Sequence, residues 1–373
     1  MTSKTEILHT IALIQIPLIG NITAHKLITA CGSAEAVFKE TAKKLSKIEH
    51  LSSAVADSIA STKDTALKTA YREMQFIEDN NIRVFLKNND DTFPQRLLPC
   101  LDAPLILYGK GNLNLNPKYS VSIVGTRRFT EYGNQAVKKI VKDLAEYKGM
   151  QIISGLATGI DTVAHQISIQ NSLPTVAVLG HGLKILYPPS NRPLAEKMLQ
   201  NGGVITEFLH DTPIDPHNFP KRNRIIAGMS DAVVVAEAHE KGGALITANI
   251  GFSYNRDIFA VPGKIGDKTS EGCNNLIKNN IAALITSGED IAKMMMWKDI
   301  PQKSKARQMK LLLDLPPEEQ LILNALEQGK ELNIDELLIA TELNTNTLST
   351  SLLMLEFKEI ITCLPGKRYV LGL

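Results

Sequence analysis

Three cations lie within four residues at positions 221–224, a density suited to a strongly anionic ligand. They are Lys221, Arg222 and Arg224, with the amide Asn223 between them and Phe219 just before. Pro220 is typical of the first position of a helix, where its missing N–H has no intrahelical partner. Cations in an opening turn oppose the helix dipole, so the pattern predicts an external anion that offsets the repulsion. The alternatives are a solvated basic face or salt bridges to Glu207, Asp211 and Asp215.

A second basic pair follows a glycine at the end of an apolar run. The sequence Gly125-Thr126-Arg127-Arg128 comes directly after residues 121–124. A glycine after a strand lets backbone N–H groups approach a phosphate, and a helix N-terminus beyond it adds a favourable dipole. Three more strand-like runs are followed by glycines, at Gly155, at Gly180 and at Gly243, with Thr247 four residues further on. Two basic patches on one rim predict a track for a polyanionic strand, on which Phe219 stacks a base.

The sequence lacks the motifs of nucleotide-binding and hydrolytic enzymes. Arg127 stands where the second glycine of a G-x-G-x-x-G fingerprint belongs, and Asp267 interrupts the only segment that approaches a Walker loop. Neither a nucleophile elbow nor a zinc-protease motif occurs. His165, four residues after Asp161, is interpreted as part of a helix start, and His181 between two glycines is the better functional histidine. We therefore expect no catalytic residue, no metal site and no cofactor.

Eight short runs rich in β-branched residues predict the strands that hold these loops. They are residues 105–108, 121–124, 151–154, 175–179, 204–207, 232–236, 258–261 and 283–286. Several are apolar throughout, as strands buried on both faces of a parallel sheet must be. Because helical stretches alternate with them, we predict an α/β fold with an open, doubly wound, mostly parallel sheet. In such a sheet the loops at the carboxyl ends of the strands meet at one crevice.

The distribution of helical and strand patterns along the sequence divides the chain into four parts. Residues 1–75 indicate short helices, at 6–15, 23–31 and 34–46, and residues 76–297 contain the predicted sheet. Residues 298–314 are predicted to form a basic linker. Residues 315–373 show three helical patterns, at 318–327, 334–342 and 345–359, followed by a hairpin-like end. Three helices closed by a small hairpin predict a winged-helix-like domain.

The bulk composition limits the class of protein. The 373 residues carry a net charge of +2, with 44% apolar and 21% charged residues, so contacts with nucleic acid must come from local clusters of cations. The four cysteines are isolated, which argues against a zinc site or a disulfide framework and suits a reducing cytoplasm. Because no run of 18 apolar residues and no signal-type segment occurs, we expect a cytoplasmic protein that does not contact a membrane.

Five segments carry a resemblance to a known family. They are residues 123–128, 154–165, 187–191, 219–228 and 243–248. In order and spacing they resemble the DNA-processing protein A family, also called Smf. The resemblance implies an extended Rossmann-like domain that binds single-stranded DNA, after an N-terminal domain of the sterile-alpha-motif or helix-hairpin-helix kind and before a C-terminal winged helix. It also implies a homodimer that protects incoming DNA in natural transformation and loads the RecA recombinase, without catalysis.

Carried onto this sequence, the resemblance implies a phosphate pocket with eight residues. They are Gly125, Thr126, Arg127, Lys221, Asn223, Arg224, Gly243 and Thr247. Two features depart from the family pattern. Gly20-Asn21-Ile22 lacks the second glycine of a Gly-x-Gly hairpin, which disfavours phosphate contact there. Residues 318–359 hold nine acids and two lysines, so we expect the winged helix to contact protein rather than duplex DNA, and the basic linker to touch the strand.

Two other functions fit parts of the pattern. One is a nucleotide-processing enzyme of the phosphoribohydrolase type, although the stretch from Gly242 to Thr247 lacks the third glycine of that loop and the acid that follows it. Release of free base from nucleoside monophosphates is its test. The other is an interaction scaffold that works through the acidic C-terminal domain. Deletion of the residues after Lys310 separates that scaffold from a DNA-binding protein.

Overall fold

A computed structural model describes residues 3–49, 51–87, 91–297, 315–326, 332–358, 360–364 and 368–371. The chain forms two compact units, Met1–Ile300 and Pro301–Leu373. Their division falls within the predicted basic linker, residues 298–314, which lies outside the described residues. The two units are therefore considered separately below.

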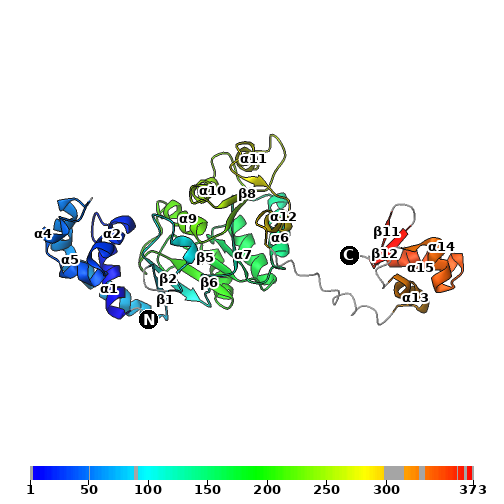
Figure 1. The fold of residues 1–373 in the computed structure, drawn as a ribbon, viewed down its shortest axis with the longest axis horizontal. Coiled ribbons are helices and arrows are strands. Elements are labelled where there is room, and N and C mark those ends of the chain that lie inside the picture. The colour runs from blue at the N-terminus through cyan, green and yellow to red at the C-terminus, as the bar shows by residue number, and fades with distance from the viewer. Residues whose placement is uncertain are drawn as a thin grey trace. The chain divides into compact units, whose positions relative to one another are not determined.

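A mixed nine-stranded sheet forms the centre of the first unit, in the order β1-β2-β6-β5-β4-β3-β7-β8-β9 (Figure 1). The strands are β1 (Arg83–Leu86), β2 (Ile106–Gly111), β3 (Tyr119–Gly125), β4 (Met150–Ser154), β5 (Thr175–Val178), β6 (Gly202–Thr206), β7 (Ala232–Glu237), β8 (Asp257–Ala260) and β9 (Ala283–Leu284). From β6 to β9 every pairing is parallel, whereas β2 pairs antiparallel with β1 and β6. The predicted α/β fold with a mostly parallel sheet is confirmed.

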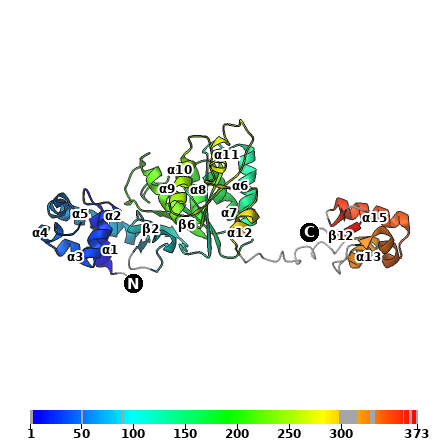
Figure 2. The ribbon, with the colours of Figure 1, turned by 45° about the horizontal axis from the view of Figure 1, so that its top comes forward.

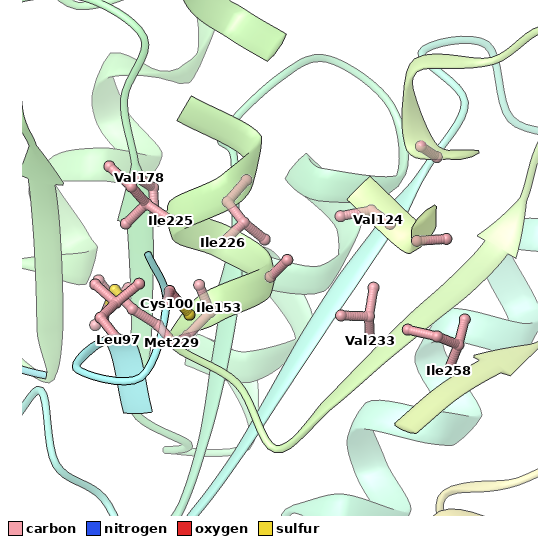
Figure 3. Packing of buried hydrophobic residues seen from close by; sticks show 14 of the residues in the cluster. Leu97, Cys100, Val124, Ile153, Val178, Ile225, Ile226, Met229, Val233 and Ile258 are labelled. Atoms are coloured by element: carbon pink, nitrogen blue, oxygen red, sulfur yellow. The ribbon is translucent and has the colours of Figure 1, made fainter. Parts of the chain in front are cut away.

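Helices cover both faces of the sheet because neighbouring strand residues point to opposite sides. Ile123 and Ile152 pack into a core with α6 (Glu131–Leu144), α7 (Ile160–Gln170) and α12 (Gly288–Met294). Val124 and Ile153, one residue further along each strand, pack into the opposite core with α9 (Asn218–Gly228), α10 (Gly243–Ser253) and α11 (Glu271–Lys278) (Figure 3). The short helix α8 (Arg192–Met198) packs over β5 and β6. This double cover places the loops at the carboxyl ends of the strands along one edge of the sheet.

Five helices precede the sheet and lie at its β1–β2 end (Figures 1 and 2). They are α1 (Lys4–Ile14), α2 (Asn21–Cys31), α3 (Ala34–Lys39), α4 (Ala42–Leu45) and α5 (Ser53–Asp79). Ile11 and Ile59 from these helices share one apolar core with Ile106 and Tyr108 of β2. The helix predicted at 34–46 is two helices, because the chain turns extended at Glu40. The boundary predicted at residue 75 falls inside α5, which has 27 residues.

The second unit contains three helices and a small antiparallel sheet of order β10-β12-β11. The elements are α13 (Pro317–Leu326), β10 (Leu332–Asn333), α14 (Ile334–Thr341), α15 (Thr345–Phe357), β11 (Ile361–Leu364) and β12 (Arg368–Leu371). Leu326, Leu337 and Leu352 from the three helices meet in its core. All three predicted helices and the hairpin are present. Among the helices described in either unit, none is long and apolar enough to cross a lipid bilayer.

Candidate functional site

The switch point of the sheet lies between β3 and β7, which are neighbours in the sheet but far apart in the sequence. The connection from β3 runs through α6 to β4 on one side, and the connection from β7 runs through α10 to β8 on the other. In open α/β sheets ligands bind at such a point, outside the carboxyl ends of the strands. The loop after β3, with Gly125, Thr126, Arg127 and Arg128, leaves from here.

Gly125 and Thr126 hold this loop against its neighbours. A Cβ atom on Gly125 would lie 2.5 Å from Cγ1 of Ile160, so the glycine is required for the approach of α7 to the end of β3. The N–H of Thr126 donates to the carbonyl oxygen of Glu237 at 2.8 Å. The hydroxyl of Thr126 accepts from the N–H of Arg128 at 3.2 Å. The Thr126 N–H, predicted to cradle a phosphate, is therefore already used by the chain itself.

The two arginines that follow are exposed at the edge of the crevice. The guanidinium of Arg127 lies 5.8 Å from the ring centroid of Phe219, within the range of a cation–π contact. The contact links the loop after β3 to α9. Phe219, a half-buried residue of α9, therefore helps to orient the Arg127 guanidinium.

Helix α9 begins at Asn218, so Pro220 is its third residue and not its first as predicted. The cations therefore start at the fourth residue of the helix. They differ in how much of each side chain is buried. Lys221 is exposed, Asn223 and Arg224 are half-buried, and Arg222 retains only 4% of its surface. The basic cluster that is continuous in the sequence thus presents one cation, Lys221, fully to solvent.

The side chain of Arg222 is buried and hydrogen-bonds to the backbone at the carboxyl ends of two neighbouring strands. Its Nη1 donates to the carbonyl oxygen of Gly155, just after β4, at 2.7 Å and to that of Val178, the last residue of β5. A Cβ atom on Gly155 would lie 2.6 Å from the same Nη1, so the glycine after β4 makes room for the guanidinium. Burial lowers the pKa of Arg222 to about 10, against the opposing effect of Asp161, and leaves it charged at neutral pH. Arg222 is thus held by backbone carbonyl groups and does not present a free cation to solvent as the sequence pattern suggested.

Arg224 is compensated within the chain. Its Nη2 forms an ion pair with Glu207, and its Nη1 donates to the carbonyl oxygen of Asp102 at 2.6 Å. Burial raises the pKa of Glu207, while the charge of Arg224 acts in the opposite direction. The expectation of uncompensated cations is therefore wrong for Arg224, and the alternative of a salt bridge to Glu207 is correct.

A second buried network shapes the loop after β4. The carboxylate of Asp161 accepts from the N–H groups of Gly155 at 3.1 Å and Ala157 at 3.3 Å. His165 does not pair with Asp161; its Nδ1 lies 2.7 Å from the hydroxyl of Thr175. Because that hydroxyl donates to the carbonyl oxygen of Ile152, Nδ1 of His165 must be the donor. Asp161 lies in the first turn of α7 as expected, but it does not form the expected helix-start pair with His165.

His181 positions an aromatic residue that the sequence reasoning did not select for the site. Its Nε2 accepts from the N–H of Tyr187 at 3.3 Å, and its Nδ1 donates to the carbonyl oxygen of Gly182 at 2.9 Å. Burial lowers the pKa of His181, which favours the neutral ring that this pattern needs. The ring of Tyr187, 39% exposed, lies 6.1 Å from that of Phe219. The signal available in the sequence was an aromatic residue placed soon after the glycines at 180 and 182.

These parts surround a small pocket beside the crevice. It is lined by Arg127, Gly155, Ala157, Thr158, Tyr187, Pro188, Phe219 and Arg222. Its volume of about 30 Å³ has room for about two water molecules, since each needs roughly 10–15 Å³. Arg127 and the two aromatic rings lie at this pocket.

The predicted Gly243 and Thr247 are not part of this pocket. Gly243 is the exposed first residue of α10, and a Cβ atom built on it meets no atom within 4 Å. Thr247, one turn later, is 1% exposed and faces the interior. Thr247 is thus placed to pack rather than to bind.

Three exposed cations remain on the rim: Arg127, Arg128 and Lys221. Within the described ranges, no carboxylate forms an ion pair with any of them. The same ranges contain no cluster of His, Cys, Asp or Glu that would hold a metal ion. The rim therefore offers positive charge to an anion from solution.

The fold and the site define a Rossmann-like α/β protein with a basic rim beside its crevice, followed by a winged-helix unit. The family model described as DNA recombination-mediator protein A matches residues 84–296, and the DprA winged helix domain matches residues 308–367. The chain belongs to the DNA recombination-mediator protein A family. The family resemblance seen in the sequence and the winged-helix prediction are confirmed.

Relatives from several bacteria share this architecture. DNA processing protein DprA of Streptococcus pneumoniae is 42% identical over 203 residues, covering 54% of this chain and 71% of the relative. Protein Smf of Synechocystis sp. is 33% identical over 332 residues, covering 79% and 82%. The X-ray structure of the S. pneumoniae protein matches with a TM-score of 0.66 at 32% identity, covering 79% of this chain and 98% of that one. A Helicobacter pylori DNA processing protein A, studied for its single-stranded DNA binding mode, matches with a TM-score of 0.52 at 27% identity, covering 58% and 95%.

Proposed function

We propose that this chain binds single-stranded DNA along the rim formed by Arg127, Arg128 and Lys221, without catalysing a reaction. The observation that carries the proposal is that these three exposed cations have no carboxylate partner in the described structure, and that Arg127 lines a pocket with two aromatic rings. Cations that track a backbone and rings that stack bases are the two elements of single-strand binding. The H. pylori relative with its single-stranded DNA binding mode supports the same ligand class.

The dimensions of the site favour a strand over a free nucleotide. The pocket of about 30 Å³ has room for about two water-sized groups, at roughly 10–15 Å³ each. The ligand must gain its affinity from charges and rings spread over the surface, and a polymer engages several of these at once. Arg222 and Arg224 are bonded within the chain, to backbone carbonyl groups and to Glu207, and hold helix α9 in place.

Salt dependence of binding tests the proposal. In the double variant Arg127→Ala, Lys221→Ala, the slope of log affinity against log salt for single strands should fall by about 1.4, because each lost phosphate contact contributes roughly 0.7. The matched control is Lys139→Ala, Lys142→Ala, which removes two exposed lysines from α6 and changes the net charge equally. Equal slopes for the wild-type chain and the Arg127/Lys221 variant would refute the assignment.

The cellular role proposed for the chain is that of a cytoplasmic, homodimeric recombination mediator. It protects incoming DNA and loads the RecA recombinase onto it during natural transformation. Membership of the DNA recombination-mediator protein A family supports this role. RecA loading is tested by the rate of RecA-dependent ATP hydrolysis on single strands coated with a single-strand-binding protein. That rate should rise with wild-type chain and not with the Arg127/Lys221 variant, and sedimentation equilibrium tests the dimer.

A further inference from the structure

The position where nucleotide-binding Rossmann proteins hold a phosphate is occupied in this chain by a glutamate. That position is the N-terminus of the helix that follows the first strand at the switch point, which here is α6 after β3. Glu237 ends the neighbouring strand β7 and is 2% exposed. Its Oε2 accepts from the N–H of Thr130, the N-cap residue of α6, at 2.9 Å.

The glycine that would admit a ligand is filled by this same carboxylate. In the sequence Gly133 suggests a close approach of backbone to phosphate. In the structure a Cβ atom on Gly133 would lie 2.2 Å from Oε2 of Glu237, so the open space at the first turn of α6 is taken up by the glutamate side chain. The residues present therefore do not fit a bound dinucleotide.

The second carboxylate oxygen shows that ordinary helix capping does not account for this arrangement. Oε1 of Glu237 is buried and has no hydrogen-bond partner among the described residues. The Oγ of Thr130 already caps α6 by accepting from the N–H of Gly133 at 3.2 Å. A buried and half-satisfied charge is unfavourable for stability, so a capping role alone is a poor reason for it.

We propose that Glu237 is a built-in anion that closes the phosphate position of the crevice. Nucleotides are thereby excluded from the switch point. The carboxylate of Glu237 determines which ligands the crevice excludes. This role does not depend on the strand binding proposed above, because its test contains no DNA.

Replacing the carboxylate tests the idea by anion rescue. Glu237→Ala leaves a cavity with the shape and electrostatics for a small anion, and propionate or inorganic phosphate should refill it. At equal ionic strength, either anion should raise the Tm of this variant by roughly 2 to 5 °C over chloride, with little change for wild type. The matched control is Asp143→Ala, which removes a partly exposed carboxylate that caps α12 through the N–H of Gly288.

The proposal is overturned if neither anion stabilises Glu237→Ala more than the wild type and Asp143→Ala. It is also overturned if the wild-type chain binds ADP stoichiometrically. If Glu237→Ala does not fold in chloride buffer, its refolding yield is measured in propionate and in chloride. A yield restored by propionate alone supports the built-in anion, and equal yields exclude it.

Discussion

Arg222 donates from Nη1 to the carbonyl oxygen of Gly155 across 2.7 Å and so connects α9 to the end of β4. The same nitrogen donates to the carbonyl oxygen of Val178 at the end of β5. One buried guanidinium therefore fixes the spacing of two strands and of the helix that carries Lys221. The helix that carries Lys221 is therefore held in place by a cation that is itself buried.

Replacement of Arg222 should lower the free energy of unfolding, and any effect on DNA affinity should follow from that loss of stability. Arg222→Ala leaves the buried carbonyl oxygens of Gly155 and Val178 without their donor, and we expect a loss of about 1–3 kcal/mol for each in the free energy of unfolding. Urea unfolding followed by the fluorescence of Trp297 measures this, since the only tryptophan packs 4.7 Å from Tyr119 in the same unit. Arg128→Ala, at an exposed position, should stay within about 0.5 kcal/mol of wild type. An Arg222→Ala chain of normal stability with weak DNA binding would instead return this residue to the interface.

Tyr187 should contribute stacking energy without contributing charge. Its ring is exposed at the pocket, whereas the ring of Phe219 is contacted by Arg127 and Arg222 at 5.8 and 5.9 Å. If the chain binds single strands, Tyr187→Ala should weaken binding by about 1–3 kcal/mol and leave the salt slope unchanged. Tyr187→Phe should bind like wild type. Anisotropy titrations with intact and abasic strands distinguish the cause, because an equal loss on both strands would mean that the ring does not stack on a base.

The stability of the first unit should fall as the pH is lowered, partly because of His165. Burial, with a smaller effect of Arg222, lowers the pKa of His165 from 6.5 to about 3. Between these values the unfolded chain binds a proton that the folded chain does not, so stability is present above pH 6.5 and is lost toward pH 3. One proton corresponds to a slope of about 1.4 kcal/mol per pH unit.

The variant His165→Gln has no group that binds this proton. The slope of its free energy of unfolding against pH should therefore be smaller than that of wild type by about the contribution of one proton. Urea unfolding at closely spaced pH values within the window provides the measurement. His217→Gln, at an exposed position, serves as the control and should keep the wild-type slope. Parallel curves for His165→Gln and wild type would show that the histidine is protonated in the folded chain.

The winged-helix unit should be dispensable for single-strand affinity. Helix α15 contains no Lys or Arg, and Glu318, Asp335 and Glu336 lie on the helices of the same unit. These charges repel phosphate. A chain ending at Lys310 should therefore bind single strands within about 0.5 kcal/mol of the full chain. A large loss in a titration at fixed salt would assign DNA contact to this unit.

The strands were predictable because their signal is local. All eight predicted runs contain a strand. A strand covered by helices on both faces is apolar along its length, whereas β9 at the edge of the sheet consists of two exposed residues. Strand β1 was missed because its four residues, Arg83 to Leu86, lie on the edge of the sheet and pair on one side only. Helix α5 was missed as a single element because its many Ser, Thr and Ala residues give a weak apolar pattern over 27 residues.

The cations of the site were predictable as a group but not one by one. Lys221 and Arg222 are neighbours in sequence, yet one is exposed and the other is 4% exposed. The difference arises from Gly155, 67 residues earlier, whose missing side chain leaves room for the guanidinium. Likewise, the partner of Arg224 is Glu207, on a different element. Contacts between distant segments decide such cases, and local patterns do not contain them.

The core shared by the first five helices and β2 has a consequence for how the chain opens. Ile11, Ile59 and Tyr108 lie in one apolar cluster, so the helices cannot detach without exposing the edge of the sheet to water. Amide hydrogens of α5 and β2 should therefore exchange with solvent in a single cooperative event of equal free energy. A protease should likewise find the N-terminal helices and the sheet resistant as one fragment.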